Sequence, residues 1–91
     1  MKVRVILFAI HREKLGQGEV EMELPAGASV SDLLKGMTNR FPEFGDLKDG
    51  LMVAVNTEYV DSQSVLNNGD EVALIPTVSG GNDDRDKDNK R

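Results

Sequence analysis

The feature that most constrains the fold is one helical pattern that stands between stretches with the alternation of strands. Ser29 is a good N-cap, and Asp32 three residues later completes a capping-box pattern near the positive end of the helix dipole. Pro42 cannot continue a helix. Between these signals, apolar residues keep the i, i+3, i+4, i+7, i+11 spacing of one buried stripe: Val30, Leu33, Leu34, Met37 and Phe41. The sequence therefore predicts a helix that begins after Ser29, ends near Arg40 or Phe41 and buries one face.

Strand patterns flank this helix on both sides. Strands are predicted at residues 2–10, 19–24, 51–56 and 71–76, with a short segment around residues 59–60. Gly16 and Gly18 mark a turn between the first two strands, so an opening hairpin is predicted. The third strand is apolar almost throughout, which favours a central position. This order predicts an α+β fold in which a mixed sheet of four to five strands packs on one main helix.

Composition narrows the class of protein. The chain has 91 residues, enough for one small domain, and no cysteine, which excludes disulfides, thiolate metal sites and a cysteine nucleophile. No apolar run reaches the roughly 18 residues that cross a bilayer, so we expect a cytoplasmic protein that contacts no membrane. The net charge of −5 falls entirely within residues 1–81. Because an acidic domain repels phosphate backbones, we expect no nucleic acid partner and favour a basic protein partner.

The last ten residues differ from the rest of the chain. Residues 82–91 contain no apolar side chain, so they bury nothing that would offset the entropy of ordering. We therefore predict a domain at residues 1–81 and a flexible, disordered polar extension at residues 82–91. The aspartates of the extension lack the spacing of a calcium loop, and no metal site is expected. His11, the one histidine, has no carboxylate or nucleophile at helical spacing and is interpreted as a solvated loop residue.

A glycine pair, Gly80-Gly81, follows the last predicted strand. Glycine has no Cβ, so two in succession can lie extended where a side chain would collide. The accompanying motifs are Leu7-Phe8-Ala9, Arg12-Glu13, Val55-Asn56, Gly69-Asp70-Glu71-Val72-Ala73 and Pro76-Thr77-Val78-Ser79. Together with the order of elements, they resemble the MoaD/ThiS family of ubiquitin-like sulfur carriers, and within it the small subunit of molybdopterin synthase. The resemblance covers residues 1–81 and implies a ubiquitin-like β-grasp fold. The chain departs from it at Thr77, where members of this subtype commonly have a second proline.

The resemblance also implies a chemistry. In the family, the carboxylate of the final glycine attacks the α-phosphate of ATP on an adenylating enzyme similar to MoeB. Sulfur then displaces AMP and leaves a C-terminal thiocarboxylate, which the large synthase subunit, MoaE, passes to a pterin precursor. On this chain the reacting carbon would be that of Gly81, with Gly80 giving a slender approach. The carrier itself would bind no cofactor, because the ATP is used by the partner enzyme.

The family's docking surface maps onto Phe8, Tyr59 and Ile75, and Pro76 and Val78 in the exit segment would add partner contacts. An exposed cluster of aromatic and aliphatic side chains is typical of an interface anchor. The alternative for each residue is an ordinary place in the core or an isolated place on the surface.

Residues 82–91 are the main difficulty for this function. While Asn82 is attached, the Gly81 carbonyl is an amide and offers no carboxylate to ATP. We favour removal of the extension by a processing protease, since a disordered polar tail is a good substrate. A permanent tail on a non-catalytic β-grasp binding module, or an extension that reflects a misplaced gene boundary, are the alternatives. Two further functions share the fold and the glycine pair: sulfur donation to thiamine or tRNA thiolation, and ubiquitin-like modification of lysines.

Overall fold

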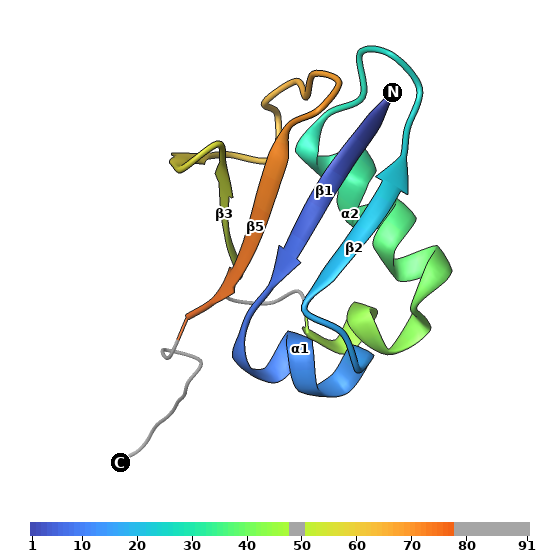
Figure 1. Cartoon of the computed structure of the whole chain (residues 1–91), viewed down its shortest axis with the longest axis vertical. Helices are drawn as coiled ribbons and strands as arrows, with labels where there is room; N and C mark the ends of the chain where they lie inside the picture. The colour runs from blue at the N-terminus through green and yellow to red at the C-terminus, as the bar shows by residue number, and fades with distance from the viewer. Residues whose placement is uncertain (48–50, 78–91) are drawn as a thin grey trace.

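A five-stranded mixed sheet carries one long helix across one of its faces (Figure 1). The computed structural model describes residues 1–47 and 51–77; the predicted boundary at residue 81 and the extension after it lie outside the described residues. The elements are β1 (Lys2–Leu7), α1 (Ala9–Leu15), β2 (Glu19–Glu23), α2 (Val30–Arg40), the 3-10 helix η1 (Pro42–Leu47), β3 (Leu51–Val55), β4 (Glu58–Val60) and β5 (Glu71–Pro76). The predicted mixed sheet and main helix are therefore confirmed.

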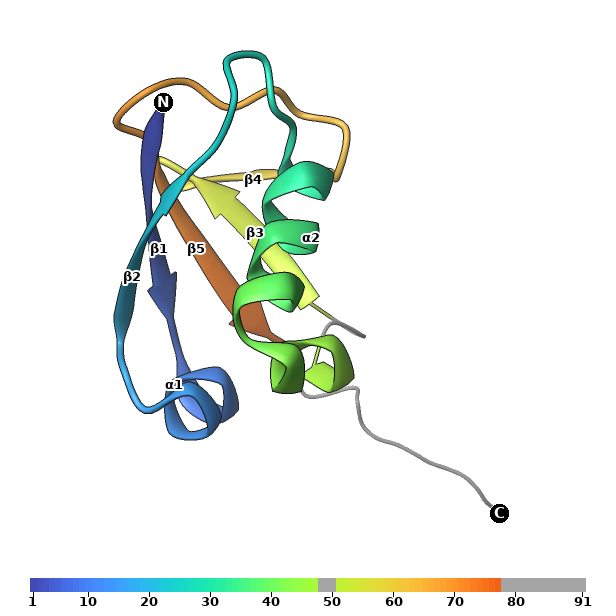
Figure 2. The same ribbon diagram turned by 90° about the vertical axis from the view of Figure 1, so that its right-hand side faces the viewer.

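The strands lie in the order β2-β1-β5-β3-β4, so the last strand of the described residues occupies the centre. β1 runs parallel to β5, and the remaining pairs are antiparallel. The predicted third strand, β3, is interior, but the centre belongs to β5. Figure 2 shows from the side that α2 lies across one face of the sheet. Side chains that alternate onto one face of the strands are buried there and form the core. They include Val3, Val5, Leu7, Val20, Met22, Val72 and Leu74.

The main helix follows the sequence prediction at both ends. The backbone N–H of Asp32 donates to Ser29 Oγ at 3.3 Å, and the N–H of Ser29 donates to the Asp32 carboxylate at 3.0 Å, which closes the capping box. This hydrogen bond from the Ser29 backbone holds the pKa of Asp32 below its ordinary value. At the other end the N–H of Phe41 donates to Met37 O at 2.7 Å, directly before Pro42. Helix α2 is therefore capped at both ends and packs as a layer against one face of the sheet.

The first predicted strand was too long, and its connection to the second strand is a short helix rather than a tight turn. β1 ends at Leu7, and Phe8 caps a seven-residue helix, α1, which joins β1 to β2. Ala9 has φ 48°, so the chain changes direction there and leaves the strand. Gly16, with φ 74°, ends α1 in the left-handed conformation that glycine tolerates best.

His11 is fully buried, so the prediction of a solvated loop residue was wrong. It lies on the face of α1 that turns towards the domain, one helical turn before the buried Leu15. Its ring centroid lies 5.5 Å from that of Phe44, which η1 places in the core. His11 is thus a packing residue that joins α1 to η1.

Candidate functional site

The face of the sheet opposite α2 carries a row of apolar side chains. Because Val5, Val72 and Leu74 point towards α2, their neighbours along the strands point to the opposite face. In register, Ile6 lies beside Ala73, Ile75 lies beside Met52, and both Ala73 and Tyr59 lie beside Ala54. We name this surface the outer patch, and it consists of Ile6, Phe8, Met52, Ala54, Tyr59, Ala73 and Ile75.

Two predicted anchor residues stand well out of the sheet. Tyr59 is 65% exposed and Phe8 is 43% exposed. Phe8 keeps an extended backbone one residue beyond β1, and the parallel register of β1 with β5 brings it level with Ile75. Tyr59 belongs to the edge strand β4, which is three strand spacings, or about 14 Å, from β1. The outer patch thus spans the sheet from β1 to β4.

The other predicted site residues lie along the exit of β5. Ile75 is partly buried, and Pro76 pairs with Leu51 where β5 ends. Val78, Gly80 and Gly81 lie outside the described residues. The described part of the chain therefore brings Phe8, Ile75 and Pro76 to the end of the sheet from which residues 78–81 continue.

The outer patch has four members that the sequence analysis did not name as part of it, and Met52 is the most exposed of them. Met52 is 42% exposed and lies directly across from Ile75 in the ladder between β3 and β5. Its strand reads as apolar on both faces, so periodicity alone could not separate Met52 from its buried neighbour Val53. Only the pairing of β3 with β5 assigns it to the outer face.

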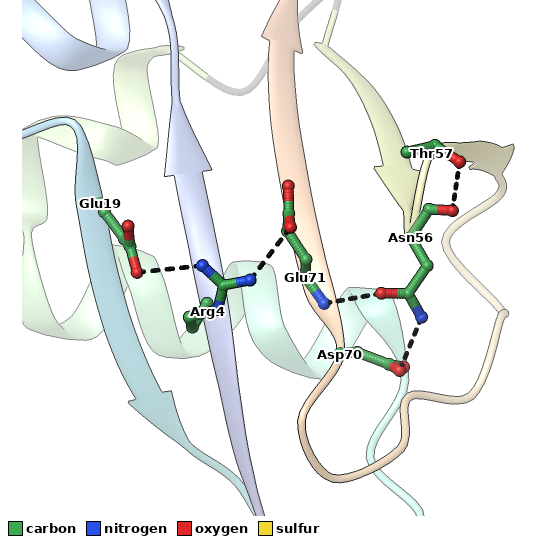
Figure 3. Close-up of polar contacts among 6 residues, drawn as sticks. All are labelled: Arg4, Glu19, Asn56, Thr57, Asp70 and Glu71. Atoms are coloured by element: carbon green, nitrogen blue, oxygen red, sulfur yellow. Dashed lines mark hydrogen bonds and ion pairs between the residues drawn. The ribbon is translucent and has the colours of Figure 1, made fainter.

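A charged row borders the outer patch. On β1, Arg4 lies two residues before Ile6, and its guanidinium donates to Glu19 on β2 at 3.5 Å and to Glu71 on β5 at 3.0 Å (Figure 3). All three side chains are about half exposed, so these ion pairs contribute little to stability. The row gives the outer patch a charged border on the β1 side of the sheet.

The hollows on the described surface are small. Three hollows on it have volumes of about 200, 240 and 290 Å³, below the roughly 300–1,000 Å³ of small-molecule sites. Within residues 1–47 and 51–77, no group of three His, Asp or Glu side chains could hold a metal ion. The helices of this same part of the chain include none long and apolar enough to span a membrane.

Comparison with known proteins assigns the family. The model of the ThiS family matches residues 5–81, which is most of the chain and ends at the second glycine. This chain belongs to the ThiS family. Its relatives include the molybdopterin synthase sulfur carrier subunit of Chlamydomonas reinhardtii, 40% identical over 89% of this chain and all of that protein. The human protein of that name is 35% identical over 88% of this chain and 94% of its own length.

Solved structures confirm the ubiquitin-like β-grasp fold. SAMP1 from Haloferax volcanii, a small archaeal modifier protein, superposes with a TM-score of 0.80 at 28% identity, over 89% of this chain and 100% of that chain. The ubiquitin-like β-grasp fold that the sequence resemblance implies is therefore confirmed.

Proposed function

We propose that this member of the ThiS family is the sulfur carrier subunit of molybdopterin synthase. The observation that carries the proposal is the family match, which runs to Gly81, together with relatives of that name that are covered over nearly their whole length. The described residues contain the two things that a carrier needs: a rigid domain, and an exposed apolar face beside the strand that leads to the glycine pair.

The proposed chemistry takes place at the carbonyl carbon of Gly81. Its carboxylate attacks the α-phosphate of ATP on an adenylating enzyme of the MoeB type, and pyrophosphate leaves. A sulfur nucleophile then attacks the acyl adenylate, AMP leaves, and a thiocarboxylate remains. This chain contributes position rather than acid, base or metal, because docking converts a bimolecular sulfur transfer into an oriented one.

Activation requires that Gly81 be the terminal residue. In the sequence Gly81 is joined to Asn82 by an amide, so the proposal includes a processing protease that cuts this bond. The family match ends at this position, and residues 82–91 lie outside it. The full chain would be a precursor that cannot be adenylated.

We further propose that the outer patch docks on the large subunit of molybdopterin synthase. The patch contains aromatic side chains with large exposed areas, which are the usual anchors of protein interfaces. A chain of the same fold comes from a complex of subunits 1 and 2 of the molybdopterin-converting factor from Helicobacter pylori, with a TM-score of 0.64 and 20% identity. That likeness supports the fold, and the exposed patch supports the choice of surface.

The test compares two lengths of the chain in a reconstituted reaction. Residues 1–81 and residues 1–91 are incubated with the adenylating enzyme, ATP and sulfide, and each product is weighed by intact mass spectrometry. We expect the shorter chain to gain the mass of one oxygen-to-sulfur exchange and the longer chain to stay unchanged. The Gly81→Pro variant of the shorter chain is the matched control and should fail to react. If the shorter chain does not react, the proposed function is wrong.

A second function is supported by the likeness to the archaeal modifier protein. In that case Gly81 would form an isopeptide bond with a lysine of another protein instead of transferring sulfur. Lysine-linked adducts of the shorter chain in source cells would identify this function, and they would be absent from a pure sulfur carrier.

A further inference from the structure

Two sequence motifs that the proposed chemistry does not use meet in the structure. Asn56 follows β3, Asp70 directly precedes β5, and Glu71 begins that strand (Figure 3). The side-chain amide of Asn56 donates from Nδ2 to Asp70 Oδ1 at 2.9 Å, and its Oδ1 accepts from the backbone N–H of Glu71 at 3.0 Å. The backbone N–H of Asn56 donates to Glu71 O at 2.8 Å. We name these three hydrogen bonds the Asn56 clamp.

The acceptor of the clamp is itself held in place. Asp70 is only 8% exposed, and its second carboxylate oxygen accepts from the backbone N–H of Asn67 at 2.8 Å. Its backbone carbonyl accepts from the N–H of Arg4 at 2.9 Å, which ties it to β1. Because both carboxylate oxygens of the buried Asp70 accept hydrogen bonds, its side chain is held in one orientation, and this fixes the acceptor of the clamp.

The clamp fixes the tight turn that carries β4. Asn56 and Thr57 both have positive φ values, 50° and 74°, as a two-residue hairpin loop requires. β4 has three residues, and among the described strands it pairs only with β3. Tyr59 stands on this short edge strand, and because it is 65% exposed, its backbone rather than side-chain packing sets its position.

We propose that Asn56, acting through Asp70, is a positioning residue that holds Tyr59 in place for docking on the large subunit. This inference rests on the proposed function. A large exposed side chain gives affinity only when its backbone is ordered before binding, since otherwise association must supply the ordering entropy. The clamp orders the turn in the free protein.

The test uses Asn56→Gly, because glycine keeps the positive φ of the turn and removes the clamp's side-chain bonds. Affinity of residues 1–81 for the large subunit is measured by calorimetry in the wild-type and Tyr59→Ala backgrounds. In the wild-type background we expect Asn56→Gly to raise the Kd about tenfold. A factor of this size corresponds to the entropic cost of ordering one anchor side chain on binding. In the Tyr59→Ala background the same change should cost less than about twofold, because the anchor it positions is already gone.

Thr57→Gly is the matched control, since it changes the same turn but leaves the clamp intact, and its affinity should equal that of the wild type. Equal losses on Asn56→Gly in both backgrounds would mean a merely structural role and would overturn the proposal. Hydrogen exchange of the β4 amides in the free protein gives a readout that needs no partner, and it should accelerate in Asn56→Gly relative to β1. Unchanged exchange would overturn the positioning role even if the wild type binds. Absence of any wild-type binding would overturn the proposed docking on the large subunit and, with it, this inference.

Discussion

Replacing Tyr59 by alanine removes the most exposed large apolar side chain of the outer patch. Tyr59 is 65% exposed in the free domain, and an aromatic side chain of about 200 Å² therefore presents about 130 Å² to a partner. At about 25 cal/mol per Å² complete coverage is worth about 3 kcal/mol. Alanine keeps part of this area and the hydroxyl is polar, so we expect a loss of about 2 kcal/mol, or about thirtyfold in Kd.

The assay is titration calorimetry of residues 1–81 against the large subunit, with thermal unfolding measured in parallel. Since the side chain is mostly exposed, Tyr59→Ala should change the free energy of unfolding by less than about 0.5 kcal/mol. Val65→Ala is the matched control: Val65 is 61% exposed but lies beside Ser29 at the start of α2, away from the outer patch. Its affinity should match the wild type. Wild-type affinity in Tyr59→Ala, or an equal loss in Val65→Ala, would refute the assignment of the interface.

Three changes test the fold that supports this face. Asp32→Asn tests the capping box. The pKa of Asp32 in the folded state lies below its ordinary value of 3.8, so the ionised carboxylate stabilises the domain at a pH above 3.8. The difference in unfolding free energy between wild type and variant should therefore narrow as the pH falls below 3.8. Urea titrations over a pH series measure this, and a gap independent of pH would contradict it. Ala9→Gly should raise the free energy of unfolding by about 0.5–1 kcal/mol, because relief of the left-handed φ of 48° exceeds the entropic cost of glycine; a lower melting temperature would contradict this. Phe44→Ala should cost about 3–5 kcal/mol in thermal unfolding, since the ring is fully buried against His11, and a loss below about 1 kcal/mol would mean that the η1 packing is wrong.

The parts of the fold that local signals specify could be predicted from the sequence. The signals that begin and end helix α2, the N-cap Ser29 and the helix-breaking Pro42, are adjacent to the helix in the sequence, so both of its ends were predicted correctly. The bounds of β5 were also correct, because a turn at Asn67–Asp70 precedes it and its apolar run ends in proline. Such features depend on neighbours in the chain rather than on tertiary contacts.

The missed elements depend on contacts between distant segments. Helix α1 has seven residues, and its N-cap Phe8 makes no side-chain cap, so the alternation of β1 seemed to continue through Ile10. His11 is buried because Phe44 comes against it from η1, a contact that spacing within α1 does not encode. Among the proposed site residues, exposure of Phe8 and Tyr59 could be anticipated only through the family resemblance.

The central claim is that Gly81 becomes the sulfur-carrying end of the protein. The intact mass of the protein isolated from its source cells tests this most directly. The account predicts a species that ends at Gly81, part of which is heavier by one oxygen-to-sulfur exchange. A chain that runs intact to Arg91 as its sole form would contradict the account, because its Gly81 carbonyl is an amide that ATP cannot activate.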